Sequence, residues 1–371
     1  PSGLLLAISL AKLNFNIYTI DLLTREKLIN KDKTYAITHS TRKILSKFNL
    51  WNKLYPYLYK FDSLSISDSV TSDFTILTTS DLDNDISSSN TIGWVVKHTD
   101  LMNVFFDELE IIDNIFFKSS LGITFEDINF DYKFVSSGAN SNLRNNKNFI
   151  DFNKEYNQSC LTFEVLVRGN FHRRAYEIFR KEGPLALLPL DSNRYQIIWT
   201  ASKSKSIDRL NSSKSFLLDN LSTLVPENLK LDQINSSINI FPVSLSLCLP
   251  IFNFSRVVFV GDSFHTFHPV GGQGLNTCWR DVNDIYDIFN RDISPSNKAL
   301  NIFKYKYYLK RFLDIFSTIF ITDILIRFFA NNNFLLIPLR KISFLLLNNF
   351  LFIRRIILNH MTKSLIFSSI K

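Results

Sequence analysis

Apolar residues recur along the chain with two different spacings, and each spacing predicts a different kind of element. Positions that return every three or four residues predict helices over residues 3–12, 41–51 and 99–111. Uninterrupted or alternating runs of Val, Ile, Phe, Tyr and Leu predict strands over residues 15–20, 131–136, 152–167, 185–200 and 256–260. Helical and strand segments alternate along the chain, which is typical of an α/β protein.

Two groups of segments have a recognisable order. The helix over 3–12, followed by the buried strand over 15–20 that Asp21 closes, has the pattern of the second half of a βαβ unit. Farther along, Asp191, Ser192 and Asn193 separate two apolar runs and favour a hairpin turn within an antiparallel meander. The pattern therefore predicts two bodies that are interleaved in the sequence, followed by a helical tail.

Composition narrows the class of protein. The 371 residues suffice for two domains, and 46% hydrophobic with 20% charged residues excludes a disordered chain. Three cysteines in so long a chain exclude a disulfide scaffold, and no pair has metal-ligand spacing. We therefore expect a protein of a reducing compartment without a structural metal.

The positive charge is concentrated at one end of the chain. Residues 302–371 hold eleven Lys and Arg against two Asp, although the formal charge of the whole chain is only +8. This distribution argues against a general nucleic-acid surface and favours a local partner. If residues 341–358 form one helix, Lys341, Asn348 and Arg355 share a stripe on an otherwise apolar surface. Such a tail either packs against the rest of the protein or lies in a membrane interface. No stretch reaches the roughly 18 uncharged apolar residues of a membrane span.

The most specific motif covers residues 256–281. A buried strand ends in Gly261 and Asp262, and a loop leads from there into a helix that begins near Leu275. The loop contains Pro269, Gly271, Gly272 and Gly274. Glycines at such a turn let a ligand approach the backbone closely, and the free N–H groups of a helix N-terminus attract electron-rich atoms. The plain alternative is a glycine-rich turn with a capping Asp.

This motif resembles the second flavin-binding motif of class A FAD-dependent aromatic monooxygenases, and most closely that of the ubiquinone-biosynthesis hydroxylases. The resemblance implies that Gly261, Gly271 and Gly272 shape an FAD site. It also implies that Asp262 holds the ribityl and phosphate end of FAD and that Pro269 lies beside the edge of the flavin ring. Gly274, Leu275 and Asn276 then face the pyrimidine part of the ring.

The start of the chain is compatible with the same family. Ser2 and Gly3 match the end of its dinucleotide fingerprint, so the chain is expected to be truncated before it, with the first strand missing. Asp21, at the end of a strand, stands where an acid of the family binds the adenosine ribose, although it could simply cap the strand. Lys33 occupies the place of an arginine that contacts the cofactor.

Weaker matches extend over most of the chain. Residues 95–98 resemble the segment over the adenine, and Ser137–Arg144 resembles a motif that serves FAD and NAD(P)H together, with Ser137 in place of its Asp. His172 and Phe179 resemble part of the substrate-sheet signature. His265 and His268 lie in the flavin loop, where a structural role is the simpler interpretation. No catalytic residue is identified.

The resemblance implies a Rossmann-like FAD-binding domain, formed by residues 1–60, 91–150 and 246–335, and an antiparallel-sheet substrate domain, formed by 61–90 and 151–245. Residues 336–371 form a basic, apolar helical tail. The implied reaction is hydroxylation of a polyprenylated phenol in ubiquinone biosynthesis, with NAD(P)H as electron donor and O2 attacking through a flavin C4a-hydroperoxide.

The expected partners are the phenol or quinone precursor, a membrane surface and other quinone-biosynthesis proteins, and no nucleic acid. The expected location is the cytoplasm, peripheral to the inner face of the membrane. Two alternatives remain at this point. One is another flavin enzyme of the superfamily, such as a polyprenyl reductase, and the other is a non-catalytic scaffold subunit of a quinone-biosynthetic complex.

Overall fold

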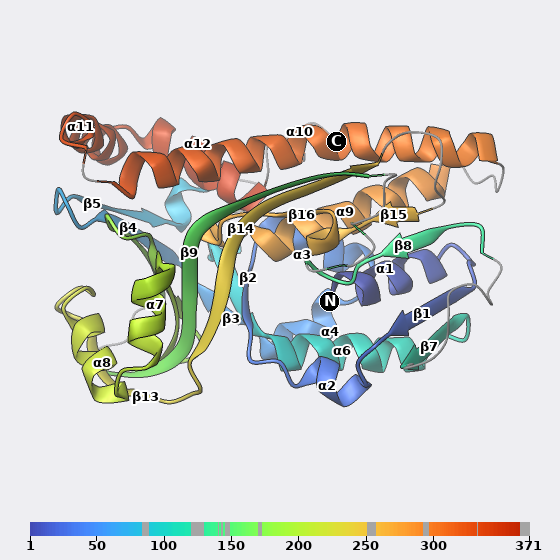
Figure 1. Ribbon diagram of the computed structural model, residues 1–371, viewed down its shortest axis with the longest axis horizontal. Helices are drawn as coiled ribbons and strands as arrows, with labels where there is room; N and C mark the ends of the chain where they lie inside the picture. Colours follow the sequence, from blue (N-terminus) through green and yellow to red (C-terminus); the bar gives the residue numbers. More distant parts are fainter. Residues whose placement is uncertain are drawn as a thin grey trace.

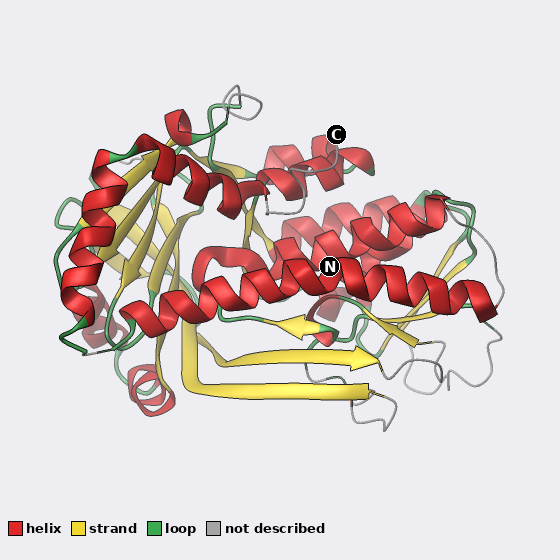
Figure 2. Cartoon of the chain, turned by 90° about the horizontal axis from the view of Figure 1, so that it is seen from above, coloured by secondary structure: helices red, strands yellow, loops and turns green. Residues whose placement is uncertain are grey.

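Two bodies lie side by side and are joined by two long strands (Figure 1). The computed structural model describes residues 1–83, 89–119, 130–139, 141, 144, 149–169, 173–250, 257–291, 297–331 and 333–363. One body holds short parallel strand pairs among helices, and the other is a large sheet covered by two helices. Three C-terminal helices lie along the top of Figure 1 and face the viewer in Figure 2.

The first body is built around helix α1 (Ser2–Ala11), in which every residue from Leu4 to Ala11 is buried. Strand β1 (Ile17–Asp21) follows it and pairs in parallel with β7 (Ile115–Ser119), as the βαβ pattern predicts. A second parallel pair joins β8 (Lys133–Val135) to β15 (Val257–Phe259). The helices that complete this body are α2 (Arg25–Ile29), α3 (His39–Lys47), α4 (Trp51–Leu54), η1 (Tyr55–Tyr57), α6 (His98–Glu110) and α9 (Gln273–Arg291).

A small antiparallel sheet lies between the two bodies. Its order is β2 (Thr34–Ile37), β6 (Gly93–Lys97) and β3 (Tyr59–Phe61). A side chain at Gly93 would come within 2.9 Å of the Ile37 carbonyl oxygen and of the Phe61 ring, so this sheet closes tightly only with glycine there. The pairing brings residues 34–37 and 94–97 together, two segments that the family resemblance assigns to the cofactor.

The large sheet has the order β16-β14-β9-β12-β11-β10-β4-β5, with β13 also paired to β9. Its strands are β4 (Ser63–Asp68), β5 (Phe74–Thr78), β9 (Phe149–Arg168), β10 (Arg174–Phe179), β11 (Leu185–Pro189), β12 (Arg194–Ser202), β13 (Lys230–Ile234), β14 (Asn239–Pro250) and β16 (His265–Thr266). The predicted hairpin joins β11 to β12, and β10, β11, β12 and β9 are antiparallel neighbours. One pair, β10 with β4, is parallel. Helices α7 (Lys203–Leu210) and α8 (Lys214–Ser222) cover one face.

Strands β9 and β14 continue from the large sheet into the first body, as Figure 1 shows. The predicted domain boundaries at residues 150 and 246 therefore fall inside continuous strands. Alternation of apolar and polar residues does not mark where such a strand leaves one body for the other. The division into two domains stays a prediction.

The tail differs from its prediction. After α10 (Asn297–Phe329), the tail consists of α11 (Leu336–Asn349) and α12 (Leu351–Lys363), so a single helix over 341–358 is wrong. The helix breaks at Phe350, which has an extended backbone with φ −118° and ψ 100°. The exposed Asn348 donates to the Phe74 carbonyl oxygen of β5, the edge strand of the large sheet, at 3.1 Å, which separates it from the proposed stripe.

None of the described helices is by itself both long and apolar enough to cross a bilayer. Helices α11 and α12 reach that length and composition only when they are taken together, and they are bent by 98° at their junction.

Candidate functional site

The two predicted cofactor motifs, which lie more than 250 residues apart in the sequence, are in direct contact. Gly261 lies just after β15 and has a φ of 65°. A side chain there would come within 3.1 Å of the Ser2 hydroxyl and 3.4 Å of Cys278 on α9. A side chain at Gly3 would clash with the Ser136 hydroxyl at the end of β8. Both glycines therefore let the N-termini of α1 and α9 approach the ends of the parallel strands.

Asp262 lies at this meeting point, in the short helix η5 (Gly261–Ser263), and its side chain is exposed. Its carboxylate accepts a hydrogen bond from the Cys278 thiol at 3.3 Å. Burial and the charge of Asp262 hold the pKa of that thiol well above its usual range. The same carboxylate influences two residues of the neighbouring sheet. Desolvation lowers the pKa of Lys33, and the charge of Asp262 opposes this shift. Desolvation raises the pKa of Tyr35, and Asp262 adds to that shift.

Tyr35 is held in place by a buried histidine. Its hydroxyl lies 2.8 Å from His98 Nδ1, and His98 Nε2 lies 2.7 Å from the Leu28 carbonyl oxygen. Because that carbonyl can only accept, His98 Nε2 donates to it and Nδ1 accepts from Tyr35. Burial lowers the pKa of His98 to about 4, so the ring stays neutral. Lys33 lies beside them with its ammonium group 5.2 Å from the centre of the Phe241 ring.

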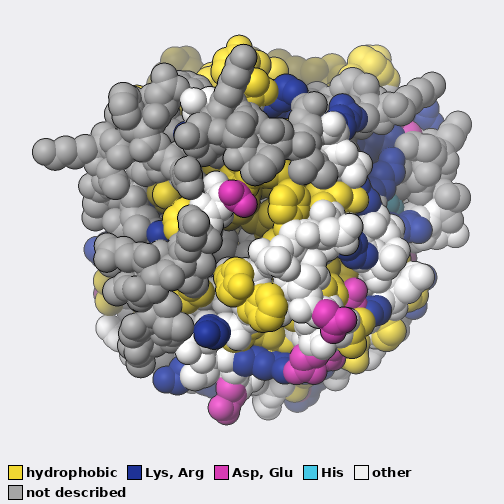
Figure 3. All heavy atoms as spheres, turned by 90° about the vertical axis from the view of Figure 1, so that its right-hand side faces the viewer, with side chains coloured by type: hydrophobic (Ala, Val, Ile, Leu, Met, Phe, Trp, Pro, Cys, Tyr) yellow, Lys and Arg dark blue, Asp and Glu magenta, His cyan; other side chains and the backbone are white. Residues whose placement is uncertain are grey.

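Asp21 lies at the end of β1, where its carboxylate accepts from the Leu23 backbone amide at 2.9 Å. Asp21 and Asp262 both act electrostatically on the nitrogen of Pro1, which places them on the same side of α1. Figure 3 shows the face at the right of Figure 1, where hydrophobic side chains are exposed between basic and acidic ones. On β1 and β7, Tyr18 and Phe116 stack at 5.1 Å there. The contact of Asp21 with a ribose stays a prediction.

The glycine-rich loop has one open side and one closed side. Gly271 and Gly272, in the short helix η6 (Val270–Gly272), have φ values of 71° and 61°. A side chain at Gly272 would come within 3.2 Å of Ala36, whereas one at Gly271 or Gly274 would meet nothing within 4 Å. Since α9 begins at Gln273, its unpaired backbone amides lie beside this open side. The loop thus fits a flat, electron-rich ring such as that of FAD.

The side chain of Asn276 forms hydrogen bonds within the protein. Its side-chain oxygen accepts from the Thr38 amide at 3.1 Å and from the Thr41 hydroxyl at 2.7 Å, and its nitrogen donates to the Ala36 and Gly272 carbonyl oxygens at 2.9 and 2.8 Å. The side chain is fully buried. Asn276 therefore fixes the loop against β2 and α3, and only its backbone is available to a ligand. Leu275 and Pro269 are partly buried beside it.

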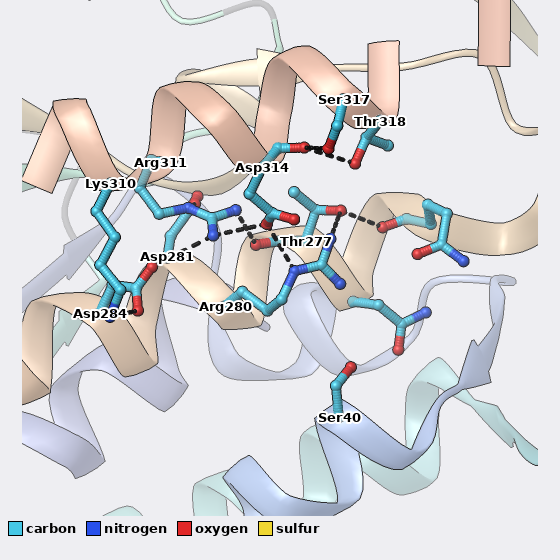
Figure 4. A network of polar contacts seen from close by, with 12 residues as sticks. Ser40, Thr277, Arg280, Asp281, Asp284, Lys310, Arg311, Asp314, Ser317 and Thr318 are labelled. Carbon is cyan, nitrogen blue, oxygen red and sulfur yellow. Dashed lines mark hydrogen bonds and ion pairs between the residues drawn. The ribbon is translucent and has the colours of Figure 1, made fainter. Parts of the chain in front are cut away.

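A buried network of ion pairs supports the loop from behind (Figure 4). Arg280 of α9 pairs with Asp314 of α10 at 2.7 Å, and Arg311 of α10 pairs with Asp281 at 2.6 Å and with Asp314 at 2.7 Å. Lys310 adds a pair with Asp284 at 2.6 Å. These side chains come from two helices that cross behind the loop, so α10 holds the first turns of α9 in a fixed position.

Asp281 connects this network to the predicted site. One of its oxygens accepts from the Gly261 amide at 2.8 Å and lies 2.8 Å from His265 Nε2. Desolvation would raise the pKa of Asp281, but His265 and Arg311 outweigh it and lower that pKa. His265 is fully buried, which agrees with the structural role predicted for it. The carboxylate that it contacts sets the position of Gly261 and hence of Asp262.

The remaining matches have structural partners. Arg144 is buried, donates to the Ala139 carbonyl oxygen at 2.9 Å and pairs with Asp151 at 2.7 Å. Phe179 stacks on Phe329 of α10 at 4.3 Å. His268 accepts from the Val270 amide at 3.3 Å, and burial lowers its pKa to about 4. Asn140 and His172 lie outside the described residues.

A wall opposite the loop was not predicted from the sequence. On the face of the large sheet that is turned toward the loop, Thr162, Glu177, Ala186 and Ile198 form one row of half-buried side chains across four neighbouring strands. The Gly271 amide lies within hydrogen-bonding range of the Glu177 carboxylate. The signal in the sequence was an acid between the hydrophobic residues Tyr176 and Ile178 of β10, at a position that alternation turns away from the helices.

The C-terminal helix also reaches the loop. The side-chain amide of Gln273 donates to the Gly271 carbonyl oxygen at 3.1 Å and to the Met361 carbonyl oxygen of α12 at 3.2 Å. Leu358 of the same helix is fully buried in a cluster with residues of β3, β4 and β5. The tail is therefore part of the structure around the site.

Comparison with known proteins agrees with this geometry. The family described as FAD binding domain matches residues 127–294. An uncharacterized protein of Synechocystis sp., slr1300, is 26% identical over 91% of this chain and 85% of its own length. The 3-demethoxyubiquinol 3-hydroxylase of Escherichia coli is 27% identical over 55% of this chain, which spans about half (51%) of that relative.

The fold is that of a known monooxygenase structure. The p-nitrophenol 4-monooxygenase PnpA of Pseudomonas putida superimposes with a TM-score of 0.73 over 96% of this chain and 94% of its own, at 14% identity. The chain shares this fold and resembles the FAD binding domain over residues 127–294. The ubiquinone biosynthesis monooxygenase COQ6 of Dictyostelium discoideum is likewise similar, at 28% identity over 47% of this chain and 41% of its own length.

Proposed function

We propose that this protein hydroxylates the aromatic ring of a polyprenylated phenol on the route to ubiquinone. The observation that supports this most is that two surfaces, the glycine-rich loop and one face of the large sheet, lie opposite each other. The open side of the Gly271–Gly274 loop, with Asp262 beside it, faces a half-buried row of the large sheet. In this arrangement one wall holds a flavin and the other receives a ring.

The chain itself binds, orients and excludes water. Asp262 accepts the hydroxyl hydrogen bonds of the ribityl chain, and Ser2 and Gly3 place the N-terminus of α1 beside the phosphates. The first amides of α9 stabilise the charge that the ring gains on reduction. FAD, when bound and reduced by NAD(P)H, supplies activation of O2, which the side chains of this chain cannot supply.

The decisive experiment is reconstitution of the purified full-length protein with FAD. We expect a yellow protein that oxidises NADH or NADPH slowly alone and faster with a phenol, and that forms a hydroxylated product from O2. A protein that takes up no FAD would support the scaffold alternative. A flavoprotein that reduces a prenyl chain and leaves the ring unchanged would support the reductase alternative.

We also propose that the tail places the enzyme on the inner face of an anionic membrane. Several aromatic side chains of the tail are more than half exposed, among them Phe334 at 73% and Phe352 at 71%. Phe312, Phe316 and Phe320 stack in a row along α10. Lys341 and Arg355 are exposed on α11 and α12. Aromatic side chains with Lys and Arg around them suit the interface between headgroups and acyl chains.

Cosedimentation with vesicles tests this proposal. We expect the full chain to sediment with vesicles of phosphatidylglycerol and phosphatidylcholine, and much less with phosphatidylcholine alone. Replacement of Phe334 and Phe352 by Ser should abolish sedimentation, because both side chains are exposed and their loss leaves the core intact. Deletion of the tail is a poorer test, since Leu358 and Met361 contact the rest of the protein. Equal binding by the double variant would contradict the proposal.

A further inference from the structure

Strand β10 carries one acidic side chain on the face that is turned toward the flavin loop. Tyr176 and Ile178 point into the core beneath α7 and α8. Alternation puts Glu177 on the other face, with Ala175 and Phe179. Phe179 packs there against Val270 of the loop and Phe329 of α10. Glu177 therefore lies between the large sheet and the loop that is proposed to hold the flavin.

The carboxylate of Glu177 is only partly satisfied. Its Oε1 atom is buried and has no hydrogen-bond partner within the described part of the chain. The Gly271 amide contacts the carboxylate and favours its charged form. Desolvation has the larger effect and raises the pKa of Glu177 to about 7. A buried acceptor atom without a partner is uncommon in a folded protein, and it is expected where a ligand supplies the missing donor.

The ionisable groups around Glu177 do not neutralise it. The Cys160 thiol is the nearest on β9, and burial raises its pKa to about 12, so it stays protonated. Asp68 of β4 faces Arg340 of α11 at 3.8 Å. His268 of the loop is neutral, because burial lowers its pKa to about 4. The protonation of Glu177 therefore depends on what occupies the space beside it.

The neighbours of Glu177 on this face suit an aromatic ring. Pairing places Ala186 beside Glu177, then Ile198, then Thr162. All four side chains are half-buried in the middle of the sheet, so the protein covers them incompletely. A small and a branched apolar side chain offer a flat surface to a ring, with the ionisable carboxylate of Glu177 beside them.

We propose that Glu177 binds the hydroxyl group of the phenolic substrate and accepts its proton as the ring is attacked. This assignment rests on the proposed function. The phenol O–H bond breaks, a new O–H bond forms on the Glu177 carboxylate, and the electron pair stays on the phenolate oxygen. The ring thereby gains electron density at the positions where oxygen is added. Glu177 is in this sense a catalytic residue.

Binding of phenol to the oxidised, FAD-loaded full chain tests the assignment. Phenol itself is the probe, because its hydroxyl stays protonated up to about pH 10, and the change in flavin absorbance reports binding. In the wild type we expect affinity to rise about tenfold between pH 5.5 and 8.5, as Glu177 ionises and accepts a charge-assisted hydrogen bond. In Glu177→Gln the affinity should not change with pH and should be about tenfold weaker at pH 8.5.

Glu155→Gln is the matched control, because it makes the same chemical change at an exposed position of the same sheet. It should keep the wild-type pH profile. A Glu177→Gln profile that rises like that of the wild type would overturn the role of Glu177 while leaving the flavoprotein assignment intact. A wild type that takes up no FAD, or whose flavin does not respond to phenol at any pH, would overturn the proposed function and this assignment with it.

Turnover gives a second measurement. Loss of a positioned proton acceptor should lower kcat for hydroxylation by about 100-fold or more, with little change in the rate at which NAD(P)H reduces the flavin. Equal losses in both rates would point to a disturbed loop and would overturn the role in proton transfer.

Discussion

The two faces of the large sheet are made by the same strands and differ in how completely the protein buries their side chains. On the face beneath α7 and α8, the apolar side chains of β9 to β12 that form the buried cluster are between 0 and 4% exposed. On the face toward the flavin loop, the row of Thr162, Glu177, Ala186 and Ile198 across the same strands is half-buried, and one member of this row is an acid. The protein covers the first face completely, whereas it leaves this row of the second face only half-covered.

The largest difference should appear when neighbouring isoleucines on the two faces are truncated. Ile197 is fully buried, so Ile197→Ala should lower the free energy of unfolding by about 2–5 kcal/mol. Ile198 is half-buried, so Ile198→Ala should cost about 1 kcal/mol and change the affinity for phenols instead. Urea unfolding of the two variants measures this. Equal losses would mean that both faces are equally packed.

Glu177→Gln should change how stability depends on pH. The pKa of Glu177 is about 7 in the folded protein against an ordinary value of 4.5, so the folded chain holds an extra proton between these values. Stability then falls as pH rises through this window. The difference in unfolding free energy between variant and wild type should move by about 3 kcal/mol in favour of the variant. Urea midpoints at pH 4.5 and pH 8 check this, and a constant difference would contradict the buried, unpaired carboxylate.

The variant Asp262→Asn tests the loop that faces this side of the sheet. Removal of the charge that accepts ribityl hydrogen bonds should weaken FAD binding by about 1.5–3 kcal/mol, which is about 10- to 150-fold. Because Asp262 is exposed, thermal stability of the apoprotein should change little. Fluorescence titration with FAD measures the affinity, and Asp232→Asn on β13 serves as the control. Unchanged affinity would remove Asp262 from the site.

The smallest effects are expected when single charged residues of the tail are replaced. Lys341→Gln and Arg355→Gln should each weaken binding to anionic vesicles by about 1 kcal/mol, which is about fivefold. Lys214→Gln is the control, because Lys214 is exposed on α8, outside the tail. If all three variants bind alike, the tail carries no specific charge contact with the membrane.

The sequence predicted the parts of the site that backbone geometry dictates. Gly261, Gly271 and Gly272 have positive φ values, and glycine is the residue that adopts them without strain. The resemblance assigned Ser2 and Gly261 to one cofactor, and the structure places the two residues in proximity. The internal hydrogen bonds of the Asn276 side chain were not predicted, because the sequence cannot tell whether an amide side chain serves a ligand or the Ala36 and Gly272 carbonyl groups.

Neither the position of Glu177 nor the helix break at Phe350 was predicted from the sequence. An acid in a strand usually faces solvent, and only the pairing of β10 with β4 and β11 turns it toward the loop. At Phe350 there is no Pro or Gly to end a helix, and the break follows from contacts with β5 such as that of Asn348 with Phe74. Long-range packing decides both.

The side chain of Gln273 ties two distant parts of the molecule to one amide group, since it donates to the cofactor loop and to the last turn of α12. Any ligand that steadies the loop also steadies that turn, and thermodynamic reciprocity requires the converse. An enzyme anchored through its C-terminal helices would thus grip its flavin with a different affinity from the same enzyme free in solution. Through this amide, attachment of the C-terminal helices and the affinity for the cofactor would depend on each other.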